Sequence, residues 1–210
     1  MQLKKVVYLS ALLVLGLALS AQASTIGNGP PNQSGGSDLN SFLEADNFNS
    51  GGNTGITHVQ FWALATGLAD FTGTVGWGFY TDAAGTPGVA VASGNSAATM
   101  VATGAAQTLG LDEYAVNFDV NVPVATNTVY WLVLHNGPSN TDPGTSFYWA
   151  WSSGASGNSQ NQFLGDTAWV GNDAELAFQV TAVPEPASLS LIAGGLITGW
   201  MKRRKLIAKN

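Results

Sequence analysis

The chain contains few residues that could take part in nucleophilic or metal-assisted chemistry. His58 and His135 are its only histidines, and neither has a second histidine at a metal-ligand spacing. There is no cysteine, which excludes a thiolate nucleophile and the Cys/His zinc patterns. The Gly-x-Ser-x-Gly sequence of a hydrolase elbow is absent from residues 24–182. We therefore expect each histidine to occupy a strand surface or a satisfied core position, and we expect no transition-metal site.

Two pairs of carboxylates have the residue types of a glycosidase acid and base. Glu44 and Asp46 are two residues apart, and Asp112 and Glu113 are adjacent. Nothing in the sequence brings either pair to the separation that such chemistry needs. Because acidic side chains are mostly found at protein surfaces, we expect these four to be solvated or to cap backbone groups.

The oxygen-rich turns are compatible with one cofactor, a structural calcium ion. Ca²⁺ takes carboxylate and carbonyl oxygens as ligands, but no segment has the EF-hand pattern. The carboxylates that could contribute are Asp46, Asp82, Asp142 and Asp173. No other cofactor is expected.

Aromatic side chains offer a different chemistry, the stacking of flat apolar faces on sugar rings. The competing expectation is that most of them fill a core. Phe147, Trp149 and Trp151 alternate along one predicted strand, so we expect them to be buried together. Trp62 and Tyr148 lie opposite apolar neighbours, and we expect these two to be exposed. The full set of candidates is Trp62, Trp77, Tyr148, Trp149, Trp151 and Trp169.

Alternating apolar residues predict the strands that would position these groups. The cleanest period-two pattern runs over residues 114–120, and another runs over 56–66. A continuous apolar run over 128–134 predicts a central strand buried on both faces. Shorter strands are predicted at residues 41–48, 73–81, 89–92, 97–103, 147–151 and 176–183, with a turn at 82–88 and a polar loop at 154–162.

Seven to nine short strands separated by Gly-rich turns are typical of all-β proteins. We predict a single β-sandwich, jelly-roll-like, over residues 41–182. Residues 24–40 are rich in Gly, Pro, Asn and Ser, and this composition predicts a flexible leader.

Charge divides the chain of 210 residues into a body and two ends. Twelve of the thirteen acidic residues lie between Ser24 and Ala182, where there is no Lys or Arg. A body of this kind excludes nucleic-acid binding, which needs cations to neutralise phosphates. All seven basic residues lie in the ends: Lys4, Lys5, Lys202, Arg203, Arg204, Lys205 and Lys209.

Residues 1–23 have the three parts of a secretory signal peptide. Lys4 and Lys5 precede an apolar run over 6–19, and Ala21-Gln22-Ala23 is a small-x-small cleavage site that would leave Ser24 as the new N-terminus. The alternative is a retained membrane anchor, for which the apolar run is short. The expected partners are the Sec translocon and signal peptidase.

The C-terminal end, residues 183–206, combines a proline-rich junction, an apolar stretch and a basic cluster. Pro184 and Pro186 keep the backbone extended, as a processing protease requires. The uncharged stretch over 187–201 would reach only about 22 Å as a helix, against a hydrocarbon core of about 30 Å, a gap that bilayer thinning or snorkelling can close. The basic cluster, Lys202 to Lys205, would stay cytoplasmic. A short helix packed on the body is the alternative.

Val183-Pro184-Glu185-Pro186, the apolar stretch and the Arg-rich tail together resemble the PEP-CTERM protein-sorting domain. The resemblance implies a Gram-negative bacterium and an exosortase, a Cys-dependent, transpeptidase-like membrane protease. Pro184, Glu185 and Pro186 correspond to the motif, and Arg203 and Arg204 correspond to its basic tail. All five would be substrate residues rather than catalytic ones.

The body also resembles, loosely, β-sandwich domains found ahead of this signal. It shares with them Ala-Asp-Asn-Phe (45–48), Gln-Phe-Trp (60–62) and Trp-x-Trp (149–151), a pattern that implies no activity. The sequence thus predicts a non-enzymatic protein that is exported, anchored transiently in the inner membrane and released to the outer surface or extracellular matrix, where such proteins accompany exopolysaccharide and biofilm. The alternative is a carbohydrate-binding module that uses exposed aromatics.

Overall fold

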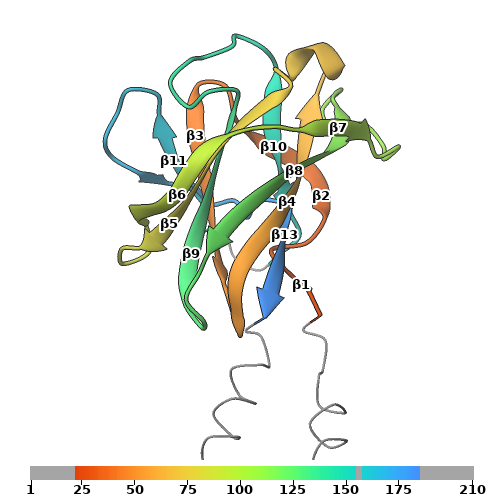
Figure 1. Ribbon diagram of the computed structural model, residues 1–210. Coiled ribbons are helices and arrows are strands. Elements are labelled where there is room, and N and C mark those ends of the chain that lie inside the picture. Colours follow the sequence, from red (N-terminus) through yellow and green to blue (C-terminus); the bar gives the residue numbers. More distant parts are fainter. Residues whose placement is uncertain (1–21, 155–157, 185–210) are drawn as a thin grey trace, which may run out of the picture. The chain divides into compact units, whose positions relative to one another are not determined.

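The computed structural model describes residues 22–154 and 158–184. These residues form two antiparallel β-sheets that enclose one main core, and they contain no α-helix (Figure 1). The prediction of an all-β sandwich is confirmed. No helix in the described ranges is long and apolar enough to span a bilayer. The signal peptide up to Ala21, the uncharged stretch over 187–201 and the basic cluster lie outside those ranges.

The first sheet is built around β4, which pairs with β8, β10 and β13. Beyond these strands, β1 pairs with β13, β2 with β10, and β7 with β8. The strands of this sheet are β1 (Ser24–Ile26), β2 (Pro31–Asp38), β4 (Asn53–Ala65), β7 (Thr99–Ala102), β8 (Asp112–Pro123), β10 (Phe147–Ser152) and β13 (Phe178–Pro184).

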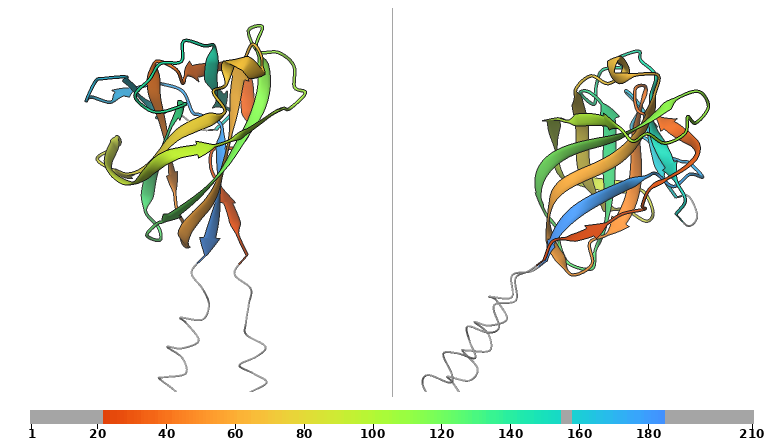
Figure 2. Two further views of the ribbon diagram at one scale, coloured as in Figure 1. Left: turned by 45° about the horizontal axis from the view of Figure 1, so that its top comes forward. Right: turned by 90° about the vertical axis from the view of Figure 1, so that its right-hand side faces the viewer.

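The second sheet has the order β12-β11-β3-β9-β5-β6. Its strands are β3 (Phe42–Asn49), β5 (Thr74–Asp82), β6 (Pro87–Ala97), β9 (Val129–Asn136), β11 (Gln160–Phe163) and β12 (Val170–Gly171). One turn of 3-10 helix, η1 (Leu68–Asp70), joins β4 to β5. Figure 2 shows the two layers from two further sides.

Strand alternation places the core where the sequence predicts it. On β8, Tyr114, Val116 and Phe118 are buried, as expected from the pattern over 114–120. Strand β9 is buried on both faces, also as predicted: Leu132 belongs to the main core, and Trp131 belongs to a second cluster on the outer side of the sheet.

The flexible leader is the first prediction that the structure corrects. Residues 24–40 contain β1 and β2, which pair with β13 and β10. The glycines that suggested flexibility allow close packing instead. A Cβ on Gly35 would lie 2.8 Å from the indole of Trp151, and one on Gly36 would lie 2.9 Å from the carbonyl oxygen of Trp149. Only a bare backbone can approach β10 this closely.

The described part of the chain has thirteen strands rather than seven to nine. Strand β6 is longer than the predicted segment 89–92, and β11 begins within the predicted loop 154–162. Strand β6 is mostly exposed and rich in Gly, Ala and Ser, and β11 is polar up to Phe163, so neither sequence carries a clear hydrophobic alternation.

The two ends of the body lie side by side. Ser24 pairs with Ala182 and Ile26 pairs with Val180, so the first strand of the body is hydrogen-bonded to its last strand (Figures 1 and 2). The hydroxyl of Ser24 also donates to Asn53 Oδ1 at 3.0 Å. The predicted leader is therefore part of the folded body.

Candidate functional site

The two histidines occupy the two kinds of position that the sequence predicts. His58 lies on the outer face of β4, with Nδ1 2.8 Å from Asp119 Oδ1 and Nε2 3.4 Å from the amide oxygen of Asn117. His135 is buried, with Nε2 2.9 Å from the carbonyl oxygen of Asn40 and Nδ1 3.2 Å from that of Gly137. Among the residues that the structure describes, the ring nitrogens hydrogen-bond to carboxylate, amide and carbonyl oxygens.

Glu44 and Asp46 are buried rather than solvated, and only Asp46 meets the other expectation, that these carboxylates cap backbone N–H groups. They face Leu134 and Leu132 across the β3–β9 ladder, on the inner side of the sandwich, and are 2% and 0% exposed. Burial raises the pKa of Glu44 to about 9, and the nearby charge of Asp38 adds to the rise. Their alternation along β3 places both carboxyl groups in the interior, where no polysaccharide can reach them.

Asp46 has partners, whereas Glu44 has an unpaired oxygen. The backbone N–H groups of Leu176 and Asn47 donate to Asp46 at 2.6 and 2.7 Å. Burial nevertheless raises the pKa of Asp46 to about 8, because desolvation outweighs those two donors. Glu44 Oε2 has no hydrogen-bond partner within the described residues. Both pKa shifts favour the neutral form of the carboxyl group in the folded state.

Asp112 and Glu113 lie on opposite faces of β8, because successive residues of a strand alternate. Asp112 accepts from the side-chain amide of Gln107 at 2.8 Å. Glu113 is 6% exposed, and its carboxylate accepts from the Thr103 hydroxyl at 2.8 Å and from the Gln33 amide. Contrary to expectation, Glu113 is thus neither solvated nor capping a backbone N–H group, and its side chain lies on the opposite face of β8 from that of Asp112.

The four carboxylates named for calcium are dispersed. Asp46 lies in β3 rather than in a turn. Asp82 accepts from the Trp131 indole at 2.9 Å, and Asp142 accepts from the backbone N–H of Gly144 at 2.7 Å. Asp173 lies on the loop before β13. Over residues 22–154 and 158–184, no group of three or more acidic or histidine side chains is placed to hold a metal ion.

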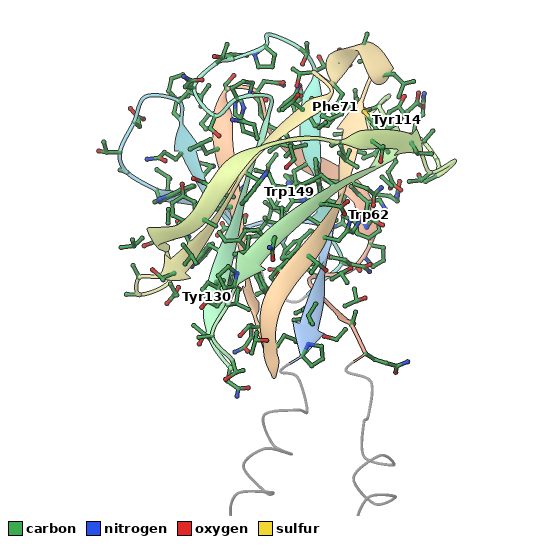
Figure 3. The ribbon with its side chains drawn as sticks, in the orientation of Figure 1. Trp62, Phe71, Tyr114, Tyr130 and Trp149 are labelled. Carbon is green, nitrogen blue, oxygen red and sulfur yellow. The ribbon has the colours of Figure 1, made fainter. Side chains whose placement is uncertain are left out.

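The aromatic residues of β10 divide between its two faces. Phe147 and Trp149 are fully buried, and Trp151 packs on the same core while remaining partly exposed, much as predicted. Trp149, labelled in Figure 3, belongs to the main core. Its ring meets those of Phe61 and Phe178 edge to face, both at 5.9 Å.

Trp62 and Tyr148 lie on the outer face of the first sheet, but they are partly buried rather than exposed as predicted. They pack with Leu111 around a small cluster of Leu64, Ala150 and Ala177. Neither residue lines either of the two cavities described below.

A second aromatic cluster covers the outer face of the other sheet, and the sequence did not reveal it. Trp131 is fully buried there beneath Tyr80 and Trp169. The rings of Tyr80 and Trp169 meet edge to face at 6.5 Å. The run over 128–134 predicts that this face is covered, but the covering segment lies more than thirty residues farther along the chain.

Beside this cluster, the outer face of β5 carries an open groove of about 370 Å³. Gly78 and Val133 are neighbours across β5 and β9 at its base. Tyr80 borders it, and Trp77, which donates its indole N–H to Ser96 at 2.9 Å, contributes to the lining. The remaining lining residues are Leu43, Ser93, Gly94, Asn95, Pro138, Ser139 and Asn140.

Buried amides hold the loop that forms one side of this groove. Asn136, which is 1% exposed, donates to the carbonyl oxygen of Asp70 at 2.8 Å and to Asn40 Oδ1 at 2.9 Å. The N–H of Gly137 donates to the carbonyl oxygen of Thr74 at 2.9 Å. The loop from Pro138 to Asn140 therefore starts from a fixed position.

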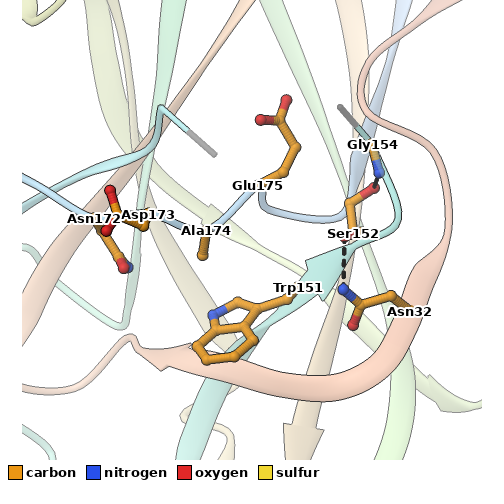
Figure 4. A pocket seen from close by; sticks show the side chains of 8 residues that line it. All are labelled: Asn32, Trp151, Ser152, Gly154, Asn172, Asp173, Ala174 and Glu175. Atoms are coloured by element: carbon orange, nitrogen blue, oxygen red, sulfur yellow. Dashed lines mark hydrogen bonds between the residues drawn. The ribbon is translucent and has the colours of Figure 1, made fainter. Parts of the chain in front are cut away.

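A smaller cavity of about 290 Å³ lies where β2, β10 and the loop before β13 meet (Figure 4). Asn32 donates to the carbonyl oxygen of Ser152 at 2.7 Å, and the Glu175 carboxylate points away from the Trp151 indole. Burial raises the pKa of Glu175. Asn172 donates to Ser37 at 3.0 Å, whereas the buried Oε2 of Glu175 has no hydrogen-bond partner within the described residues.

The predicted processing residues lie partly within the described ranges. Ala23 is exposed, Ser24 begins β1, and Pro184 ends β13 in extended backbone, as expected for it. Ala21, Glu185 and Pro186 lie outside, as do the basic residues Lys202, Arg203, Arg204 and Lys205.

Comparison with known proteins leaves the chain without an assigned family. No family model matches it, and no curated protein matches it. Among solved structures it is similar to a CocE/NonD family hydrolase from Staphylococcus aureus, with a TM-score of 0.32 and 7% identity. That match covers 79% of this chain and 37% of the hydrolase. A likeness this small carries no argument about fold or activity.

Proposed function

We propose that the chain is an exported, non-enzymatic protein of the outer surface or extracellular matrix. It enters the Sec translocon, loses residues 1–23 to signal peptidase, and is held in the inner membrane by a short C-terminal helix. An exosortase then cuts near Pro184, Glu185 and Pro186 and releases the body. The observation that carries the proposal is the confinement of every Lys and Arg to the two ends of the chain.

The pairing of β1 with β13 is compatible with processing at both ends of the body. Ser24 and Ala182 are strand partners, so the two predicted processing sites lie at the ends of the same pair of strands. Neither cut removes a residue of the main core. The mature body, a jelly-roll-like sandwich, keeps its hydrogen-bonded edge.

The surroundings of His58 and of the buried carboxyl groups support a non-enzymatic role for the body. His58 faces Asp119 and an amide, so it lacks the hydroxyl of a nucleophile. Glu44 and Asp46 are sealed inside the sandwich. The role proposed for the body is therefore binding or structural, in association with exopolysaccharide.

Replacing Pro184, Glu185 and Pro186 together with alanine is expected to prevent processing. In a Gram-negative host that carries an exosortase, intact mass of fractionated cells should show the wild-type protein outside the cell as a species near residues 24–184. The triple variant should remain in the inner membrane with its basic tail. Because Pro30 is exposed and remote from the motif, Pro30→Ala serves as the control and should be processed normally. A wild-type protein that keeps its tail in the inner membrane would refute the sorting proposal.

A second candidate function is glycan binding by the body. The observation that favours it is the open groove on the outer face of β5, rather than Trp62 and Tyr148.

A further inference from the structure

The groove on β5 exists because two outward positions of the strand are glycines. Side chains at 76, 78 and 80 point to the outer face, and only Tyr80 has one. A Cβ on Gly78 would lie 2.5 Å from Tyr80 Cε2, so the Tyr80 ring leans over the bare backbone. A Cβ on Gly76 would lie 2.5 Å from the carbonyl oxygen of Gly137 and 2.7 Å from Ser139 Oγ. Any larger residue at either position would displace a wall of the groove.

The lining combines two aromatic residues, Tyr80 and Trp77, with short polar side chains. Ser93 and Asn95 are exposed on β6, opposite Gly78 and Gly76. Ser139 and Asn140 are exposed on the loop that faces them across the groove. Hydroxyl and amide groups donate and accept hydrogen bonds, as the hydroxyl groups of a sugar require. Leu43 and Val133 supply the apolar part of the surface.

Charge determines which ligands fit this surface. No lining residue is acidic or basic, and the described residues contain no Lys or Arg at all. An anionic sugar would enter an acidic body without a counter-charge. A cationic ligand would find no carboxylate in the groove. The complementary ligand is neutral, polar and flat-faced, and the volume of about 370 Å³ lies within the usual range of small-molecule sites, about 300–1,000 Å³.

We propose that this groove binds a short segment of a neutral polysaccharide. Tyr80 stacks on a sugar ring, Asn95 and Asn140 hydrogen-bond its hydroxyl groups from opposite sides, and Trp169 holds Tyr80 in place from the edge. This inference makes the proposed surface role more specific. It rests on that role only in assuming that the protein meets exopolysaccharide outside the cell.

Direct binding to the purified full-length chain in detergent tests this inference. The probes are neutral oligosaccharides of glucose, galactose, mannose and N-acetylglucosamine, with oligosaccharides of uronic acids as the anionic comparison. Tryptophan fluorescence and saturation-transfer NMR report binding. We expect at least one neutral probe to bind, with an affinity that changes less than twofold between 50 and 500 mM salt, because no ion pair contributes.

Three variants locate the binding surface. Ser93→Trp fills the groove from an exposed position and should weaken binding at least tenfold. Asn95→Ala combined with Asn140→Ala removes both amides and should weaken binding about tenfold. Trp62→Ala alters a half-exposed aromatic residue on the other sheet and should change affinity less than twofold. All four substituted positions lie outside the main core, so far-ultraviolet circular dichroism should be unchanged.

Three outcomes would overturn the inference: no neutral probe binds, only uronic acids bind, or Trp62→Ala removes binding while Ser93→Trp does not. Localisation separates this test from that of the proposed function. If the chain reaches the outer surface but binds no glycan, glycan binding by the groove is refuted and the proposed export and sorting are not.

Discussion

Replacing Glu44 with glutamine is expected to stabilise the body by about 2–4 kcal/mol at pH 7.5 and to leave its stability unchanged near pH 4. Glu44 is 2% exposed and its Oε2 has no hydrogen-bond partner in the described structure. Ionising it in the interior is costly, because no basic residue of the described chain can compensate the charge. Glutamine has the same shape as the neutral acid and cannot ionise.

The direction of the pH dependence follows from the pKa values of Glu44 in the unfolded and the folded state. Burial raises the pKa of Glu44 from 4.5 to about 9, so the folded state binds its proton more tightly than the unfolded state does. The resulting stability is fully present below pH 4.5 and is lost progressively as the pH rises towards 9. Asp46, whose pKa rises from 3.8 to about 8, acts in the same direction. Each group contributes a slope of at most about 1.4 kcal/mol per pH unit.

Urea unfolding at pH 4, 6, 7.5 and 9 measures this effect. Wild type should lose stability across the series, and Glu44→Gln should show a shallower slope. Glu113→Gln is the matched control, because Thr103 and Gln33 already donate to that buried carboxylate. The control should not be stabilised at pH 7.5.

Adding Ca²⁺ to the same unfolding experiment tests whether the buried carboxyl groups bind a cation. If millimolar Ca²⁺ abolished the pH dependence of wild type, a bound cation would be holding the buried carboxylates ionised. That result would contradict the neutral state argued for Glu44 and Asp46. It would support the structural calcium ion that the sequence left open.

Trp149→Ala is expected to destabilise the body by about 3–5 kcal/mol, the usual cost of deleting a fully buried large aromatic side chain. The Trp149 indole fills the space between Phe61 and Phe178, and its N–H donates to the carbonyl oxygen of Ala177 at 2.8 Å. Removing it leaves a cavity and takes from the Ala177 carbonyl oxygen one of its two donors, the other being the backbone N–H of Trp62 at 3.2 Å.

Tyr148→Ala supplies the matched control from the next residue of the same strand. Its side chain points to the outer face and is half exposed, so its removal should cost about 1 kcal/mol. Urea unfolding at pH 5 compares the two variants where both buried carboxyl groups are largely neutral in the folded state. Equal losses would mean that the two faces of β10 are not the core and surface described above.

Local patterning was sufficient for much of the fold. The alternation over 114–120 depends only on neighbours along one strand, and it correctly places Tyr114, Val116 and Phe118 in the core. The run over 128–134 likewise predicts burial on both sides of β9. Polar segments were less predictable. The sequence of β2 resembles a linker, and only its closeness to Trp149 and Trp151 explains its glycines.

The candidate site could not be derived in the same way. The sequence separates Gly76 from Gly137, and Tyr80 from Trp169, by sixty residues or more, and neither pair has a local signal. The aromatics that local alternation favoured, Trp62 and Tyr148, were correctly assigned to an outer face. Whether a face is flat, covered or hollow depends on the segments that cross it.

The sequence by itself determined the all-β class, the inner and outer faces of the strongest strands, and a body without cations. These properties depend on composition and on contacts between near neighbours, which the linear order contains. The export and sorting signals are also linear patterns, and they remain predictions. Only the tertiary structure decided that Glu44 and Asp46 are buried, that the predicted leader completes a sheet, and that a groove opens beside Tyr80. Each of these depends on pairing between distant strands, where backbone hydrogen bonds and close packing outweigh the local preference of the residues.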